Sequence, residues 1–115
     1  MPIGTDWAAL APRAIALELE GGRNQCLLRG RPETAGMRSG LVVLAPGTSV
    51  GKHNTGSREE LIVVLDGHGE FRSDGAEPLR MHAGSAVYCP PRRGHDVVNT
   101  GRGALRYVYV AAEAR

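Results

Sequence analysis

The sequence predicts an all-β fold in which many short strands alternate with turns. Glycine (16) and proline (7) are abundant among the 115 residues, and both favour turns. Between these turns lie short runs rich in valine and leucine. One of them, Leu61–Leu65, contains three β-branched residues and is closed by Asp66-Gly67. We therefore expect a strand there, buried on both faces and followed by a tight turn.

Length and charge restrict the classes of protein that the chain fits. With 115 residues, it is long enough for one domain with a sizeable core, which we expect to span residues 1–115. The net charge is +2, and the basic residues are scattered along the chain, so nucleic-acid binding is not indicated. No apolar run approaches the length of a membrane span, and no membrane association is expected.

The leading part of the chain predicts one helical turn and three strands. The turn begins at Thr5-Asp6 and ends before Pro12. It contains Trp7, which we expect to pack on the outside of the fold or across a subunit interface. Apolar and acidic side chains alternate in Ala14–Glu20, a pattern typical of a strand. The next two strands are expected at Gln25–Arg29 and Leu41–Leu44.

The remaining strands follow the turn at Gly67. Each is a short run bounded by glycine, proline or aspartate. They are expected at Glu70–Ser73, Leu79–His82, Ser85–Cys89, His95–Asn99 and Leu105–Val110. The third of these stops at Pro90-Pro91, because proline cannot extend a central ladder.

Two stretches carry polar residues at regular spacing, and together they cover about half of the chain. The first reads Gly47, five residues, His53-Asn54-Thr55, four residues, Glu60, six residues, Gly67. The second reads Gly84, five residues, Pro90-Pro91-Arg92, two residues, His95, three residues, Asn99. In order and spacing they resemble the paired motifs of the cupin superfamily. Thr55 stands where the family has its second histidine, and Arg92 where it has glycine.

This resemblance implies a small single-domain cupin: a double-stranded β-helix, or jelly-roll barrel, with one motif histidine replaced. It also implies a divalent metal held inside the barrel by His53, Glu60 and His95. Two imidazoles and a carboxylate suit iron, manganese, nickel, copper or zinc. Thr55 is a poor ligand, which would at most hydrogen-bond a metal-bound water.

Strand alternation sharpens the candidate site. If His53 lies in a strand, Thr55 two residues along faces the same side. Glu59 and Glu60 face opposite sides, and the count back from Gly67 selects Glu60 as the inward one. Arg92 and Arg93 lie on a loop expected near the barrel mouth, where they would bind a carboxylate or phosphate.

Two functions from different classes are compatible with this pattern. One is a metalloenzyme acting on a small polar or anionic molecule by Lewis-acid polarisation or oxygen activation. The other is a non-catalytic protein that binds or senses a small molecule in a metal-free pocket. The retained His53, Glu60 and His95 favour the first function, and Thr55 favours the second.

The resemblance and the termini also bear on partners and compartment. In small cupins, leading strands often pair with a second subunit, so we expect a homodimer. The N-terminus shows no basic region followed by an apolar one, which indicates a cytoplasmic protein with Cys26 and Cys89 as free thiols.

Overall fold

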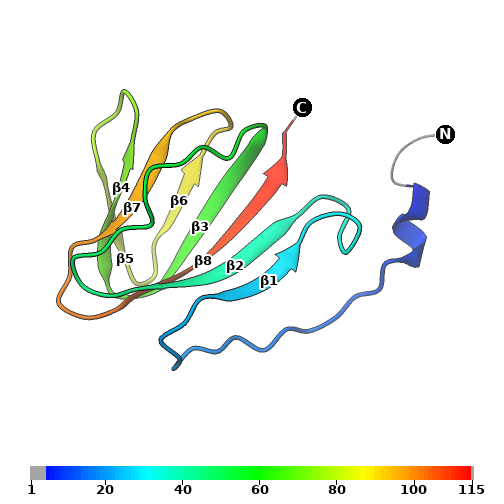
Figure 1. Ribbon diagram of the computed structural model, residues 1–115, viewed down its shortest axis with the longest axis horizontal. Coiled ribbons are helices and arrows are strands. Elements are labelled where there is room, and N and C mark those ends of the chain that lie inside the picture. The colour runs from blue at the N-terminus through cyan, green and yellow to red at the C-terminus, as the bar shows by residue number, and fades with distance from the viewer. Residues whose placement is uncertain (1–4, 115) are drawn as a thin grey trace.

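The computed structural model describes residues 5–114, whose strands form two antiparallel sheets that face each other (Figure 1). The larger sheet contains, in spatial order, β1 (Gln25–Arg29), β2 (Arg38–Leu44), β8 (Leu105–Glu113), β3 (Arg58–Asp66) and β6 (Ala86–Cys89). The smaller sheet contains β5 (Leu79–His82), β4 (His68–Ser73) and β7 (His95–Asn99). The predicted all-β fold is therefore confirmed, and so is the helical turn, a 3-10 helix at Thr5–Ala9.

Apolar side chains from both sheets meet between them and form the core. Strand alternation sends every second residue of each strand into this space. Its buried members are Leu44, Ile62, Val64, Phe71, Met81, Val87, Cys89, Val97, Leu105 and Tyr107. Cys89 is a free thiol within this core, and Cys26 is a free thiol on the surface.

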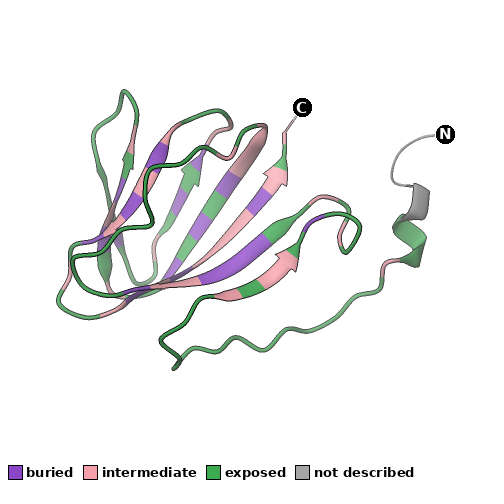
Figure 2. Cartoon of the chain, in the orientation of Figure 1, coloured by how far each residue is buried: buried purple, intermediate pink, exposed green. Residues whose placement is uncertain are grey.

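The expectation that β3 is buried on both faces was wrong. Ile62 and Val64 are buried, but Leu61 and Val63, on the opposite face, are 43% and 38% exposed (Figure 2). The smaller sheet covers one face of the larger sheet, and among residues 5–114 no layer lies against the outer face of β3. An unbroken apolar run does not distinguish these two situations.

The expectation of a strand at Ala14–Glu20 was also wrong. Residues 10–18 are extended but belong to no sheet. Two bonds to the side chain of Gln25 hold this segment: its Oε1 accepts from the Glu18 amide, and its Nε2 donates to the Ala16 carbonyl. Alternating polarity gave the right local conformation, but a strand also needs a partner with free backbone groups.

The N-terminal segment leads away from the two sheets. Figure 1 shows the chain running outward from β1 to the 3-10 helix, and Trp7 in that helix is 61% exposed. The expected packing of Trp7 on the outside of the fold is therefore not found within this chain. The radius of gyration is 15.1 Å, against about 13 Å for a compact chain of this length. No helix among residues 5–114 is long and apolar enough to cross a membrane.

The segment between β2 and β3 runs antiparallel to β7 and brings the first motif to the second. The Asn99 carbonyl accepts from the Gly47 amide, and the Val97 carbonyl accepts from the Val50 amide. Further along, His53 and His95 form an isolated β-bridge. Gly51, with a φ of 100°, interrupts the pairing, so this segment is a bridged loop rather than a strand.

Gly67, which turns β3 into β4, provides a test of this packing. Its φ is 90°, and an added Cβ would collide with the backbone of Ala104 and Leu105. Gly75 has a φ of 72° but has open space around the same position. We predict that Gly67→Ala lowers the free energy of unfolding by more than about 2 kcal/mol, and Gly75→Ala by about 1 kcal/mol, in urea denaturation. Equal losses in the two variants would contradict the close approach at Gly67.

Candidate metal centre

The β-bridge between His53 and His95 positions two imidazoles side by side. Each residue donates its amide to the other's carbonyl, at 2.9 Å from His53 and 2.8 Å from His95. Directly paired residues in an antiparallel bridge project from the same face. The two rings accordingly lie with their centroids 4.3 Å apart. Phe71 from β4 stacks against the His95 ring at 5.2 Å.

Glu60 reaches the same point from the opposite sheet. On β3 its side chain faces inward and is 7% exposed, while Glu59 lies on the outer face and accepts a 2.8 Å bond from the Tyr88 hydroxyl. The expectation from alternation about these two glutamates is confirmed. Glu60 Oε1 lies 3.0 Å from Nε2 of His95, which is itself 1% exposed.

Backbone carbonyls fix which nitrogen of each imidazole faces the centre. Nδ1 of His53 lies 2.9 Å from the Gly51 carbonyl, and Nδ1 of His95 lies 2.9 Å from the Arg93 carbonyl. A carbonyl oxygen only accepts, so both Nδ1 atoms carry a proton and donate it. In the neutral rings, both Nε2 atoms are then lone-pair donors. Such carbonyl bonds are the usual way in which proteins orient histidine ligands.

The contact between Glu60 and His95 requires a proton or a metal cation between the two atoms. A carboxylate oxygen and an unprotonated Nε2 are both acceptors, and two buried acceptors at 3.0 Å repel each other. The hydrogen bond to Glu60 raises the pKa of His95 above its ordinary value of 6.5, although burial of the ring opposes this shift. A proton on Nε2 satisfies the pair, and so does a cation shared between the two residues.

The geometry of the three side chains fits a divalent cation. One ligand atom from each of His53, Glu60 and His95 lies within 4.8 Å of the other two. Ligands bound at about 2.0–2.2 Å from one ion stand roughly 3–4 Å apart, so a small inward movement is sufficient. Two imidazole nitrogens and one carboxylate oxygen are donors that suit first-row transition metals.

Thr55 shares the cavity with His53, as expected, but not for the expected reason. His53 is not in a strand, so alternation does not relate it to Thr55. The Thr55 hydroxyl instead donates a 2.7 Å bond to the Arg58 carbonyl, closing the turn that leads into β3. Thr55 still lines the cavity beside the three candidate ligands.

A cavity of about 440 Å³ opens from this centre between the two sheets. Beyond the candidate ligands, two arginines line it: Arg38 from the start of β2 and Arg58 from the start of β3. Arg92 and Arg93, expected to bind an anion here, do not line it. Sequence reasoning missed both Arg38 and Arg58. A signal existed for Arg58, since it lies two residues before the inward-facing Glu60 and strand alternation puts the two on the same face.

Two tyrosines add hydroxyl groups to the cavity wall. Tyr107 and Tyr109 project inward from β8, and burial raises the pKa of both phenols above 10. Both hydroxyls therefore keep their protons at neutral pH and are available as neutral hydrogen-bond donors. Tyr88 faces outward and lines no part of this cavity.

Asn99 stands at the other end of β7 from His95. Its Nδ2 donates to the carbonyls of Leu44 and Gly103, and its Oδ1 accepts from the Gly101 amide. These bonds hold the loop before β8 against the end of β2. Asn99 is therefore part of the framework that carries β7, and it makes no contact with the candidate ligands.

Comparison with known proteins agrees with this architecture. The family model of the cupin domain matches residues 40–111. The fold is similar to a Cupin 2 conserved barrel domain protein from Salinispora arenicola CNS-205, with 30% identity, a TM-score of 0.71, and coverage of 90% of this chain and 91% of that one. No match is found among curated protein sequences.

Two more distant structures share the fold alone. One is an RmlC-like cupin family protein with a double-stranded β-helix fold from Methanocaldococcus jannaschii, with 15% identity, a TM-score of 0.73, and coverage of 90% of this chain and 93% of that one. The other is described as a predicted oxalate decarboxylase from Thermotoga maritima, with 20% identity, a TM-score of 0.65, and coverage of 88% and 100%.

The raised pKa of His95 gives a pH dependence for the metal-free protein. The protonated pair with Glu60 stabilises the fold fully below the unfolded-state pKa, and this contribution is lost as the pH rises through the higher folded-state pKa. We predict that the free energy of unfolding falls over that window in urea denaturation of chelator-treated protein. Glu60→Gln removes the partner and flattens the profile.

Glu59→Gln is the matched control, since it makes the same chemical change on the outer face of β3. It should keep the pH profile of the wild type. A profile that is flat in the wild type, or equally flattened in both variants, would show that the Glu60–His95 pair does not set it.

Proposed function

This chain belongs to the cupin family, and we propose that its barrel holds a divalent metal ion through His53, Glu60 and His95. We further propose that a small polar or anionic molecule binds beside this ion. The observation that carries the proposal is the convergence of three ligand atoms within 4.8 Å, with both imidazoles oriented by backbone carbonyls. A structural histidine pair does not require a nitrogen of each ring to lie within 4.8 Å of one carboxylate oxygen.

The residues have distinct roles under this proposal. His95 and Glu60 are buried, so they would bind the ion away from solvent, while His53 is exposed and stands toward the open side. Iron, manganese, nickel, copper and zinc all accept this donor set. When bound, such an ion supplies Lewis-acid polarisation of a ligand oxygen. Three protein ligands leave coordination positions free for a small molecule.

A second candidate function is supported by one specific observation. The Glu60–His95 pair is complete with a single proton, since the two groups already lie 3.0 Å apart. Thr55, in place of a histidine, is engaged with the backbone of Arg58. Both features favour a non-catalytic protein that binds or senses a small molecule in a metal-free pocket.

Metal titration separates the two functions. We predict that chelator-treated wild-type protein binds nickel or zinc stoichiometrically in calorimetry, because three ligands are already gathered. His95→Ala leaves two ligands and should abolish binding. Thr55→His should tighten it where the larger side chain fits the cavity.

His68→Ala is the matched control for His95→Ala. His68 lies at the start of β4, exposed and outside the cavity, so its removal should leave metal affinity unchanged. Circular dichroism confirms that each variant is folded. Absence of binding in the wild type, or equal binding in all variants, would reject the metal centre in favour of the metal-free pocket.

We also propose that the protein is a homodimer. Two apolar surfaces are exposed in the part of the chain that the structure describes: the extended segment with Ile15, Leu17 and Leu19, and the outer face of β3 with Leu61 and Val63. The segment has strand-like geometry without a sheet partner, and a second copy of the chain would supply one. Burial of both surfaces would stabilise the pair by the hydrophobic effect.

Light scattering at micromolar concentration tests this assembly. We predict a mass of twice the 12.2 kDa of the chain for the wild type. Leu61→Glu places a charge on the outer face of β3 and should yield a monomer. Leu79→Glu makes the same change on β5, where the leucine is 49% exposed, and should remain dimeric. A monomeric wild type would refute the proposal.

A further inference from the structure

We infer that the cavity takes a small organic dianion, with one oxyanion at the His53–Glu60–His95 end and the other between Arg38 and Arg58. This inference rests on the proposed binding function of the barrel and names its ligand class. It follows from the positions of the two arginines, from their shortage of hydrogen-bond and acidic partners, and from the side chains that line the cavity.

Sheet register places Arg38 in line with Glu60 on the inner face. Arg38 pairs with Ala111 across β2 and β8, and Ala111 pairs with Glu60 across β8 and β3. Two interstrand spacings separate the Cα atoms of Arg38 and Glu60 by about 10 Å. The residue between them is alanine, whose methyl group leaves room above the sheet for a ligand.

Arg58 approaches from the other direction. It lies two residues before Glu60 on β3, so the two share a face with their Cα atoms about 7 Å apart. The guanidinium Nε of Arg58 is buried and has no hydrogen-bond partner among residues 5–114. This Nε forms an ion pair with Glu113 at 3.9 Å, but the acid is 47% exposed and too distant for a hydrogen bond. A buried donor without a partner is costly, and an anion in the cavity satisfies it.

The charge of the wall favours an anion. Among the described residues that line the cavity, Glu60 is the one carboxylate, and His95 already partners it. Arg38 has no acidic partner within residues 5–114. Arg38 is therefore without an acidic partner and Arg58 has only the long ion pair with Glu113, and the planar geometry of both guanidinium groups suits a carboxylate.

The remaining wall favours an organic ligand over an inorganic one. Ala111 lies between Arg38 and Glu60, so a hydrocarbon linker joining the two ends would pass over its methyl group. Val42 and Ile62 line the cavity on the other side of this row, where they exclude water from it. The ring of Tyr109 lies against Gly40, where an added Cβ would come within 2.7 Å of its Cε2. Glycine at this position lets the ring lie close to β2 instead of filling the cavity.

The contribution of the second oxyanion is measured by comparing each dicarboxylate with the monocarboxylate of the same carbon number. Calorimetry compares malonate with propionate, succinate with butyrate and glutarate with valerate, on nickel-loaded and on chelator-treated protein. We expect at least one dicarboxylate to bind about tenfold or more tightly than its monocarboxylate partner. In Arg38→Gln and Arg58→Gln this ratio should fall toward one, while nickel affinity measured without carboxylate stays at the wild-type value.

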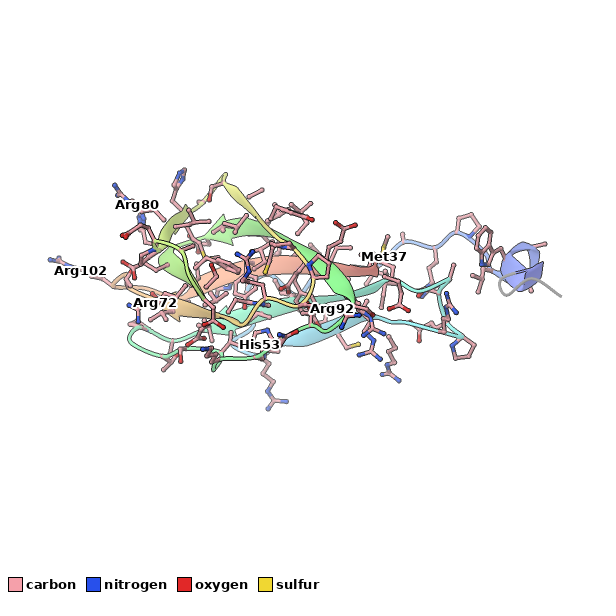
Figure 3. All side chains as sticks on the ribbon, turned by 90° about the horizontal axis from the view of Figure 1, so that it is seen from above. Met37, His53, Arg72, Arg80, Arg92 and Arg102 are labelled. Carbon is pink, nitrogen blue, oxygen red and sulfur yellow. The ribbon has the colours of Figure 1, made fainter. Side chains whose placement is uncertain are left out.

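Arg102→Gln is the matched control for the loss of a positive charge. Arg102 projects from the end of the barrel farthest from the N-terminal 3-10 helix (Figure 3) and lines no part of the cavity. It should keep the wild-type ratio. An equal fall in this variant would reduce the effect to overall charge and overturn the inference.

The remaining outcomes separate the inference from the function on which it rests. If nickel binds but no dicarboxylate is preferred, or the preference survives in both arginine variants, the arginine subsite is refuted and the metal centre stands. If no nickel binds but chelator-treated protein prefers a dicarboxylate through Arg38 and Arg58, the subsite is supported and the metal centre is refuted.

Discussion

The candidate site depends on one short interaction, the pair of backbone hydrogen bonds between His53 and His95. His53 belongs to a loop, where the bond from its Nδ1 to the Gly51 carbonyl orients the ring and the bridge fixes the backbone that carries it. The bridge makes the loop an extra edge of the smaller sheet for two residues, which is enough to set the direction of both side chains. Gly51 separates this bridge from the pairing nearer β2, and Gly56, with a φ of 66°, lies in the turn from His53 to β3.

The larger sheet supplies everything that the bridge faces. Its register aligns Arg38, Ala111 and Glu60 across three strands, and the small central residue keeps the inner surface open. The outer surface of the same strands presents Leu61 and Val63. Alternation thus gives one sheet two unlike faces, a polar cavity wall within the barrel and an apolar surface outside it. Both arise from the same two-residue period of the strand.

Much of this could be predicted from the sequence, and the failures have physical causes. Strand positions followed from short apolar runs and turn residues, and motif spacing brought His53, Glu60 and His95 into one group. The prediction of a strand at Ala14–Glu20 failed because alternating polarity indicates the local conformation but not the presence of a partner strand. Thr55 lines the same cavity as His53, as expected, but alternation is not the reason, because His53 lies in a bridged loop and not in a strand. Arg38 could not be linked to Glu60, since their proximity depends on the register of β2, β8 and β3.

The buried carboxylate of Glu60 explains why replacement of one motif histidine need not empty the site. An ionised group this deeply buried is unstable without a positive partner. His95 supplies that partner when protonated, and the proposed metal ion would supply it when His95 is neutral. The two states would compete for one position, so binding of the proposed metal would release a proton. The requirement for a cation comes from Glu60 and His95, whereas Thr55 affects only how many protein ligands that cation receives.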